Sequence, residues 1–270
     1  MKRSAISWCD FSGGDLNFVW GCTPVSAGCE NCYARASYKR FGRDFSKVSW
    51  DVDKLWRATQ RMYPLPGNKR GPGRKPLLFV CDTGDLFHPT VTRLVQRWAI
   101  ADMGRNPYAD WAILTKRPEN IPGDILWPDN VWLGVTAENQ EMADERIPLL
   151  LATGARVKFV CVEPMLGPVS LTQIQWDKYT SMNVLEGCGL TTAPGMMGQS
   201  IPNCYCGKLD WVIVGGESGP HRRPFDPRWA NYIWQECQGT GVPMFYKQGS
   251  ALRPGQDDLL DGREIKEWPM

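Results

Sequence analysis

The sequence predicts an α/β fold, a complete or partial (β/α) barrel of about six to seven parallel strands. Short apolar, β-branched runs recur along the 270 residues, as expected for parallel strands that are buried on both faces. Stretches with helical spacing separate these runs, so strands and helices alternate. A doubly wound open sheet is the alternative architecture. In both folds the site forms at the carboxyl ends of the strands, because the connecting loops converge there.

The expected strands share an apolar centre, and most end in a polar residue or glycine. In chain order they cover residues 6–9, 77–82, 111–116, 131–138, 157–163, 211–218 and 243–248. The expected helices cover residues 31–40, 91–103, 140–151 and 228–238. We therefore expect one barrel domain over residues 1–270.

Residues 171–208 break this alternation. They show no clear strand and are rich in glycine, proline and cysteine. A long segment without regular structure is usually functional or mobile, so we expect an insertion after the fifth recognisable strand, acting as a lid or an accessory metal loop. Its candidate ligands, for zinc or a second cluster, are Cys188, Cys204 and Cys206. His221 or Cys237 is the candidate fourth ligand.

The charge balance gives no global electrostatic signature of a nucleic-acid binder. The chain has 31 basic and 29 acidic residues and a net charge of +2, so any such binding must be local. The N-terminal stretch MKRSAISWCDF lacks the apolar core of a signal peptide, and no apolar run is long enough to span a bilayer. We therefore expect a cytoplasmic protein without a membrane partner. In that reducing compartment the ten cysteines should be thiols or metal ligands.

Cys22, Cys29 and Cys32 form the pattern Cys-x6-Cys-x2-Cys in the stretch GCTPVSAGCENCYARA. Three thiolates can hold three irons of a [4Fe-4S] cube and leave the fourth iron open for a substrate or cofactor. Alternatively, the cysteines build a structural zinc site with a distant fourth ligand, because zinc sites are usually closed by four protein ligands. The spacing alone does not decide between the two metals.

Most candidate ligand-binding residues follow predicted strands. Asp82 and Asp85 are suited to receive a cationic amino group or to act as general bases. Glu163 closes an apolar run, where a carboxylate is costly unless a ligand or a cation pairs with it. Gly215 and Gly216 allow the backbone to approach a ligand closely. The other polar strand ends are Thr115, Lys116, Arg117, Glu138, Glu217, Ser218 and Lys247.

Several of these segments together resemble a known family. The fragments, which span residues 6 to about 250, are ISWCDF, GCTPVSAGCENCYA, FVCDTGDLFHP, AILTKRPE, VWLGVTAENQ, FVCVEPMLGPV, DWVIVGGESGP and FYKQGS. They resemble the phage-associated three-cysteine-motif proteins, a group similar to radical S-adenosylmethionine (SAM) enzymes. The resemblance favours a cluster over zinc. Two features depart from the usual radical SAM pattern, namely the six residues between Cys22 and Cys29 and the late Gly-Gly-Glu that begins at Gly215.

The resemblance implies a [4Fe-4S] cluster on Cys22, Cys29 and Cys32, with SAM bound to the open iron. Reductive cleavage of SAM, which needs an electron donor, then supplies a 5′-deoxyadenosyl radical. By the same resemblance, Asp82 or Asp85 binds the SAM amino group. Thr136 and Glu138 are expected to contact the ribose, and Lys247 is expected to bind a carboxylate. The residues expected beside the adenosyl end or the substrate are Glu163, Gly215, Gly216, Glu217 and Ser218.

Phage association implies a DNA substrate. The expected reaction is an isomerase-type rearrangement or another modification of a (hyper)modified thymine base, by a phage-encoded protein in a bacterial host. The candidate phosphate contacts, which would make DNA binding salt-dependent, are Lys69, Arg70, Arg74, Lys75, Arg222 and Arg223. Two alternatives are a lyase that repairs damaged pyrimidines by the same chemistry and a non-catalytic, zinc-stabilised nucleic-acid binding protein.

Overall fold

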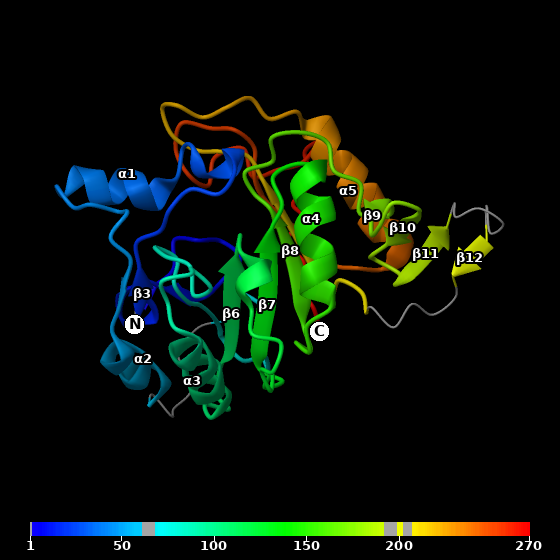
Figure 1. The fold of residues 1–270 in the computed structure, drawn as a ribbon. Helices are drawn as coiled ribbons and strands as arrows, with labels where there is room; N and C mark the ends of the chain where they lie inside the picture. The colour runs from blue at the N-terminus through cyan, green and yellow to red at the C-terminus, as the bar shows by residue number, and fades with distance from the viewer. Residues whose placement is uncertain (1, 61–67, 192–198, 202–206) are drawn as a thin grey trace. The chain divides into compact units, whose positions relative to one another are not determined.

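The structure is a computed structural model, which describes residues 2–60, 68–191, 199–201 and 207–270 (Figure 1). The chain divides into two compact units. The N-terminal unit comprises Met1–Gly134 and Gly154–Val157, and the C-terminal unit comprises Val135–Thr153 and Lys158–Met270. No helix among the described residues is long and apolar enough to cross a membrane.

The strands of the main sheet are hydrogen-bonded in the order β1-β2-β5-β6-β7-β8-β13-β14. From β2 onward this order follows the chain, without the reversal of strand order that defines a doubly wound sheet. The predicted α/β class and the partial (β/α)-barrel topology are therefore confirmed. The bounds are β1 Lys2–Arg3, β2 Phe11–Ser12, β5 Leu77–Phe79, β6 Asp110–Thr115, β7 Val131–Thr136, β8 Lys158–Val162, β13 Trp211–Gly215 and β14 Met244–Gln248.

In the N-terminal unit, β2 pairs with β5 and β5 pairs with β6, both in parallel. Two short strands, β3 (Val19–Trp20) and β4 (Ser49–Trp50), form a separate antiparallel pair. The side chains of Leu77, Leu78 and Trp111 are fully buried, and each such burial contributes about 1.5–3 kcal/mol. This apolar packing explains why the runs at 77–82 and 111–116 were recognisable as strands.

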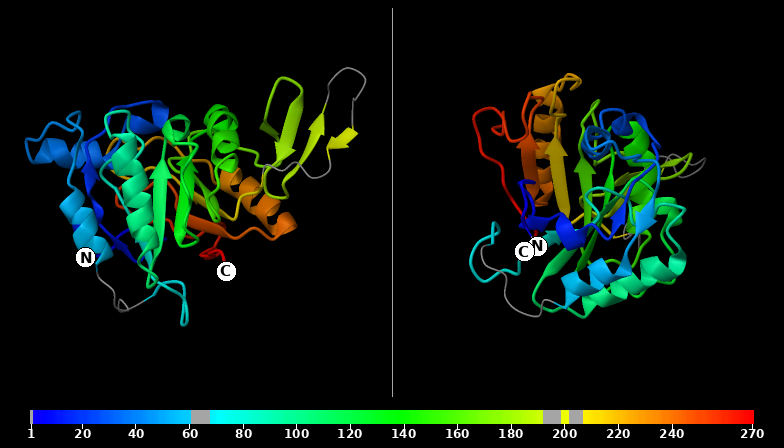
Figure 2. Two further views of the ribbon diagram at one scale, coloured as in Figure 1. Left: turned by 60° about the horizontal axis from the view of Figure 1, so that its bottom comes forward. Right: turned by 90° about the vertical axis from the view of Figure 1, so that its left-hand side faces the viewer.

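Three helices belong to the N-terminal unit: α1 (Tyr33–Arg40), α2 (Val52–Thr59) and α3 (Arg93–Gly104). Figures 1 and 2 show α2 and α3 side by side. Helix α3 buries Ala99, Ile100 and Met103, which recur at the three- to four-residue spacing of one helix face. Helix α2 was not predicted. Its N-terminus is defined by Asp51, whose carboxylate accepts the backbone N–H groups of Asp53 and Lys54.

The prediction of a first strand at residues 6–9 is wrong. The backbone there forms a turn, in which the Ser4 hydroxyl accepts from the N–H of Ile6 and the Ser4 N–H donates to the carbonyl of Asp10. Trp8 and Cys9 are buried in this turn, so their apolar character reflects core packing rather than a strand. The strand that pairs with β5 is instead β2, directly after the turn.

In the C-terminal unit, β13 lies between β8 and β14 and pairs with both in parallel. Its helices are α4 (Gln140–Leu151) and α5 (Pro227–Thr240). Asn139 caps the N-terminus of α4 by accepting from the N–H of Met142. Helix α5 ends at Gly241, which adopts a left-handed conformation with φ of 71°, a geometry that favours glycine. Both helices agree with the predicted ranges to within a few residues.

Residues 171–208 contain strands, contrary to the prediction. An antiparallel sheet in the order β12-β11-β10-β9 extends beside α5 in Figure 1. Its strands, β9 Ile174–Gln175, β10 Thr180–Asn183, β11 Cys188–Thr191 and β12 Gln199–Ile201, are too short to give a clear alternating pattern. Gly187, with φ of 76°, closes the tight turn between β10 and β11 by donating to the carbonyl of Asn183.

Candidate functional site

The loop that carries the three cysteines lies against the loop that follows β5. Gly21 donates its N–H to the carbonyl of Thr83 at 3.0 Å and forms a bridge with Gly84. A Cβ on Gly21 would lie 2.6 Å from the carbonyl oxygen of Lys47, and a Cβ on Gly84 would lie 2.7 Å from that of Val19. Gly84 therefore permits the close approach of the two loops, and Gly21 permits the approach of the chain before Cys22 to the backbone of Lys47.

Cys22, Cys29 and Cys32 are half-buried, and none is in a disulfide. Cys29 ends a short 3₁₀ turn, and Cys32 is the N-cap residue of α1. Tyr33, the first residue of α1, ties the helix to the same loop by donating its hydroxyl to the backbone carbonyl of Asp82.

The thiols of Cys22 and Cys29 differ in their electrostatic surroundings. Burial raises the pKa of Cys22, the Asp85 carboxylate raises it further, and the charge and hydrogen bond of Arg117 oppose both. Burial would also raise the pKa of Cys29, but backbone hydrogen bonds and the charge of Lys116 outweigh it, and the pKa lies below its ordinary value. The surroundings therefore favour the thiolate at Cys29 and the thiol at Cys22, where Arg117 only partly offsets burial.

Arg117, which follows β6, hydrogen-bonds to Thr23, the residue after Cys22. Its Nη2 donates to the carbonyl oxygen and to the hydroxyl of Thr23, at 2.8 Å each. The Arg117 side chain is buried, and its Nε has no hydrogen-bond partner among the described residues. A buried guanidinium thus lies beside the start of the cysteine motif, and its Nε–H is available to donate a further hydrogen bond.

His88 completes this contact. Its Nδ1 accepts from the N–H of Thr90 at 3.2 Å, so the proton of the neutral ring lies on Nε2, which donates to the Thr23 hydroxyl at 3.0 Å. Burial lowers the pKa of His88, and the Arg117 charge lowers it further. His88 therefore supports Thr23 as a neutral hydrogen-bond donor.

The two aspartates after β5 have different environments. Both carboxylate oxygens of Asp85 accept from the Thr115 hydroxyl, at 2.8 and 3.0 Å, and the backbone N–H groups of Phe87 and Lys116 also donate to this carboxylate. Asp82 accepts from the amide of Asn17, and no cationic side chain pairs with it in the described part of the chain. Burial raises the pKa of Asp82. Asp82 is therefore better placed than Asp85 to receive a cationic ligand group.

In the C-terminal unit, Glu138 is fully buried with Arg146. The Arg146 Nη1 lies 3.0 Å from the Glu138 carboxylate and 2.8 Å from the carbonyl oxygen of Thr136. The exposed side-chain fractions are 2% for Arg146 and 0% for Glu138. The Thr136 side chain is also buried. One function of Glu138 is thus to neutralise a buried arginine.

Glu163 and Lys247 form an ion pair across the ends of β8 and β14. Both side chains retain partial exposure, 19% and 18%. A Cβ on Gly215, at the end of the intervening strand β13, would lie 3.3 Å from the Glu163 Cδ and 3.4 Å from the Lys247 Cβ. Gly215 therefore provides the space in which this pair meets.

The carboxylate of Glu217 is held by Arg223, through its backbone N–H at 2.8 Å and through its guanidinium. A Cβ on Gly216 would lie 2.7 Å from the backbone of Gly249 and Ser250. At Gly216 the absence of a side chain therefore allows close contact with the protein's own backbone at Gly249 and Ser250. The neighbouring Ser218 forms a backbone bridge with Ala251 in the same arrangement.

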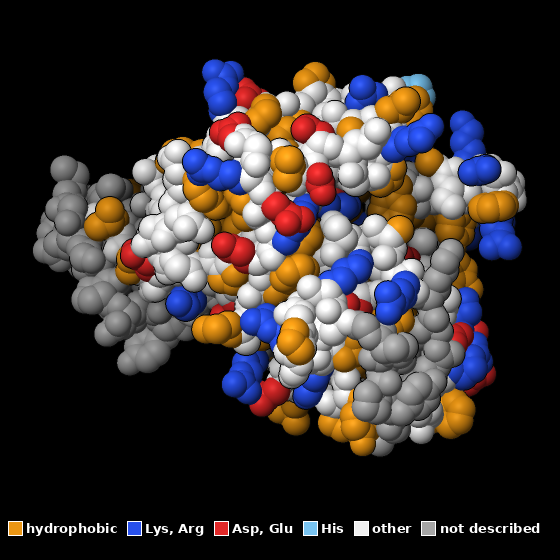
Figure 3. Space-filling model, turned by 180° about the vertical axis from the view of Figure 1, so that it is seen from behind, with side chains coloured by type: hydrophobic (Ala, Val, Ile, Leu, Met, Phe, Trp, Pro, Cys, Tyr) orange, Lys and Arg blue, Asp and Glu red, His pale blue; other side chains and the backbone are white. Residues whose placement is uncertain are grey.

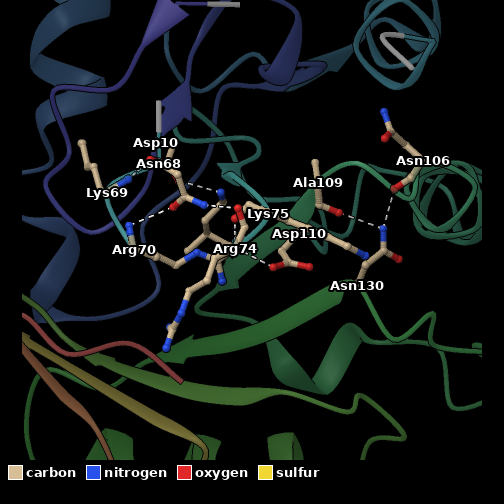
Figure 4. Close-up of polar contacts among 11 residues, drawn as sticks. Asp10, Asn68, Lys69, Arg70, Arg74, Lys75, Asn106, Ala109, Asp110 and Asn130 are labelled. Atoms are coloured by element: carbon tan, nitrogen blue, oxygen red, sulfur yellow. Dashed lines mark hydrogen bonds and ion pairs between the residues drawn. The ribbon is translucent and has the colours of Figure 1, made fainter. Parts of the chain in front are cut away.

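Two of the six predicted phosphate contacts make extensive internal bonds (Figure 4). The Lys69 ammonium donates to the carbonyl oxygens of Ser4, Ile6 and Cys9, at 3.2, 2.9 and 2.7 Å. The Arg70 guanidinium, 3% exposed, pairs with Asp110 at 2.6 Å. A phosphate would have to displace these partners.

The other predicted phosphate contacts are more accessible, apart from Arg223 with its carboxylate partner. Lys75 and Arg222 are exposed, and Arg74 is half-buried. On the face drawn in Figure 3, lysine and arginine side chains are scattered among aspartate and glutamate side chains. This distribution agrees with the small net charge of +2.

The family model described as "Protein of unknown function (DUF5131)" matches residues 3–269. The chain belongs to this family. No match to the DUF5131 chain was found among curated proteins.

Solved structures of spore photoproduct lyase are similar to the DUF5131 chain. The lyase complexed with dinucleoside spore photoproduct is 12% identical, with 87% of this chain and 62% of that chain covered and a TM-score of 0.47. A cysteine-to-serine mutant is 13% identical, with coverages of 60% and 48% and a TM-score of 0.45. A double mutant with bound AdoMet and dinucleoside spore photoproduct is 12% identical, with the same coverages and TM-score. The DUF5131 chain thus spans less than two thirds of the length of these proteins.

The chemistry of the three N-terminal cysteines suits a cluster. Among the described residues of the DUF5131 chain, no three His, Cys, Asp or Glu side chains are grouped so that they could surround one metal ion. A cube does not require such convergence, because each thiolate binds a different iron. The three thiols are half-buried and outside disulfides, and the surroundings of Cys29 lower its pKa, so the three cysteines fit the ligand set of a [4Fe-4S] cluster with an open iron.

The second predicted metal site is described only in part. Cys204 and Cys206 lie outside the described residues. Cys188 begins β11, and its thiol lies 3.5 Å from the Glu186 carboxylate. Cys237, a candidate fourth ligand, is fully buried in α5. A metal site in this segment stays a prediction.

Proposed function

We propose that this protein is a radical SAM enzyme. The observation that carries the proposal is the set of three half-buried cysteines outside disulfides, on one loop beside the end of β5, in a chain whose motifs resemble radical SAM relatives. Cys22, Cys29 and Cys32 would hold a [4Fe-4S] cluster, and the open iron would bind SAM. When bound, the cluster and SAM supply reductive cleavage of the sulfonium and hydrogen abstraction.

The chain's own residues would orient the ligands and keep water out. Asp82 is the best candidate for the amino group of SAM, because it is a half-buried carboxylate without a cationic partner among the described residues. Thr136 and Glu138 are proposed for the ribose, with Glu138 also bound to Arg146. The proposed groups for the adenosyl end, a carboxylate or the substrate are Glu163, Gly215, Gly216, Glu217, Ser218 and Lys247.

For the substrate we propose a modified thymine base in phage DNA. Exposed Lys75 and Arg222 are suited to phosphate contacts, whereas Lys69 and Arg70 are bonded within the protein. Each lost phosphate contact should lower the slope of log affinity against log salt by about 0.9. Lys75→Gln should therefore weaken DNA binding and flatten this slope. Unchanged duplex affinity between low and high salt would contradict a DNA substrate.

The decisive experiment begins with anaerobic purification and analysis of iron, sulfide and zinc. A brown protein with about four irons, and release of 5′-deoxyadenosine with dithionite and SAM, would support radical chemistry. Omission of dithionite is the control. Colourless protein with stoichiometric zinc would overturn the enzyme proposal and favour a zinc-stabilised binding protein. Incubation with modified and with ultraviolet-damaged DNA then separates base modification from pyrimidine repair, because the products differ.

A further inference from the structure

We propose that Arg117 is the positioning residue of the cysteine loop and the cation that tunes the reduction potential of the cluster bound there. This inference rests on the proposed function, because it concerns the cluster. It adds a residue outside the cysteine motif, 94 positions from its contact at Thr23.

The contact fixes the backbone directly after the first cluster ligand. One nitrogen of Arg117 donates both to the carbonyl and to the hydroxyl of Thr23, at 2.8 Å each. Since Thr23 follows Cys22 in the chain, this paired contact limits the rotation of the peptide that joins them. The rigid, planar guanidinium fixes the direction of this nitrogen, whereas a lysine ammonium is a point charge at the end of a flexible stem.

The backbone of Arg117 is fixed by a chain of hydrogen bonds through Thr115 to Asp85. Its backbone N–H donates to the Thr115 hydroxyl at 2.9 Å, and that hydroxyl donates to Asp85. Asp85 also accepts from the backbone N–H groups of Phe87 and Lys116. The arginine therefore starts from a rigid point at the end of β6, as a positioning group requires.

The Arg117 side chain and the Thr23 hydroxyl beside the cysteines have donors available for an anionic group held there. The Arg117 side chain is 94% buried, with a 6% exposed fraction, yet its Nε has no partner among the described residues. The Thr23 hydroxyl accepts from Arg117 and from His88, so its own proton remains to be donated. A buried donor without a partner is costly, and an anionic cluster with its thiolates would accept from Arg117 and from the half-buried Thr23.

The charge of Arg117 has a predictable effect on reduction. An added electron makes the cluster more negative, and a nearby buried cation stabilises that state. Asp85 does not form an ion pair with Arg117 among the described residues, because Thr115 lies between them in the hydrogen-bond chain. Loss of the Arg117 charge should therefore shift the midpoint potential to more negative values.

The test compares the reconstituted wild-type protein with Arg117→Gln, Arg117→Lys and Thr23→Val. Arg97→Gln is the matched control, because Arg97 pairs with Asp124 on the surface of the same unit. The readouts are iron content, the midpoint potential from an EPR-monitored titration with dithionite, and the rate of iron loss to a chelator.

For Arg117→Gln we expect a more negative midpoint potential and about tenfold faster iron loss, since losing a side chain that hydrogen-bonds beside a metal ligand typically weakens metal binding by about 10–100-fold. Arg117→Lys should restore the potential but not the slow iron loss, because it keeps the charge and replaces the rigid planar donor with a flexible one. Thr23→Val should speed iron loss, and Arg97→Gln should change neither readout.

Unchanged potential and iron loss in Arg117→Gln, with a wild-type cluster present, would overturn this inference and leave the proposed function intact. Wild-type protein that binds zinc or no iron would overturn both. Should Arg117→Gln fail to fold, Arg117→Lys and Thr23→Val decide: wild-type iron loss in both contradicts the positioning role.

Discussion

The polar strand ends of the two units differ in how their charges are matched. In the C-terminal unit three glutamates have cationic partners: Glu138 with Arg146, Glu163 with Lys247 and Glu217 with Arg223. The N-terminal unit instead presents three thiols outside disulfides and, among the described residues, an Asp82 carboxylate without a cationic partner. Unmatched groups cost stability unless a ligand completes them. The N-terminal unit therefore carries the stronger indication of chemistry, and the C-terminal carboxylates first need to be tested as structural pairs.

The largest expected effect comes from removing the thiols of the N-terminal unit. Cys22→Ser, Cys29→Ser and Cys32→Ser should each abolish the iron content and the release of 5′-deoxyadenosine, because a cube with an open iron already has the minimum of three protein ligands. Iron and sulfide analysis and product chromatography measure both. Cys188→Ser, a change at a half-buried cysteine of the C-terminal unit, is the control. Equal iron loss in this control would remove the contrast between the units.

Opening the fully buried pair of the C-terminal unit should cause the next largest effect. Arg146→Met leaves the Glu138 carboxylate buried without its cation, which should lower the free energy of unfolding by about 3–5 kcal/mol. Chemical denaturation followed by circular dichroism measures it. Arg228→Met is the matched control, because Arg228 pairs with Asp226 on the surface, and it should have little effect. A comparable loss in both variants would mean that burial does not govern these pairs.

The two adjacent glycines at the end of β13 should respond differently to the same change. Gly216→Ala places a methyl group 2.7 Å from the backbone of Gly249, which should lower stability by about 1–3 kcal/mol. Gly215→Ala meets side-chain atoms of Glu163 and Lys247 at 3.3–3.4 Å, which can move, so its effect should be smaller. Thermal unfolding compares the two. The reverse order would indicate that the ion pair is more rigid than the backbone turn.

The smallest effect should be a gain. Burial raises the pKa of Asp82, so its ionised form is less stable in the folded than in the unfolded chain. This penalty is present above the folded-state pKa and is relieved as the pH falls toward the ordinary value of 3.8. Asp82→Asn should therefore raise the free energy of unfolding at neutral pH, and the gain should shrink in acid.

Denaturation of the Asp82→Asn variant at pH 7 and at about pH 5 checks the sign. Glu163→Gln is the comparison in the C-terminal unit, and it should lower stability because it weakens the pair with Lys247. A stabilised Asp82→Asn variant that no longer cleaves SAM would show that this carboxylate is kept for function at a cost in stability. Stabilisation in both variants would contradict the assignment of Glu163 to a structural pair.

The sequence by itself determined the elements whose signal is local. Apolar runs of a few residues predicted six of the main strands, and helical spacing predicted α3, α4 and α5, because burial on both faces or on one helix face leaves a direct trace in residue order. Helix α1 was expected directly behind the last cysteine of the motif. The motif of Cys22, Cys29 and Cys32 was also visible, since its spacing is written within eleven residues. Short elements were missed, namely β2, α2 and the small antiparallel sheet, because two to eight residues carry too little pattern.

Only the tertiary structure decided which polar groups meet. Glu163 and Lys247 are 84 positions apart, and Thr23 and Arg117 are 94 apart. Residue types identify a charge that needs a partner, but partner choice depends on which strand ends become neighbours. The same holds for the glycines, because Gly216 shows from sequence only that close approach is allowed, and the fold shows that the approaching group is the backbone of Gly249. Secondary structure follows from local preference, whereas charge pairing and close backbone contact follow from non-local packing.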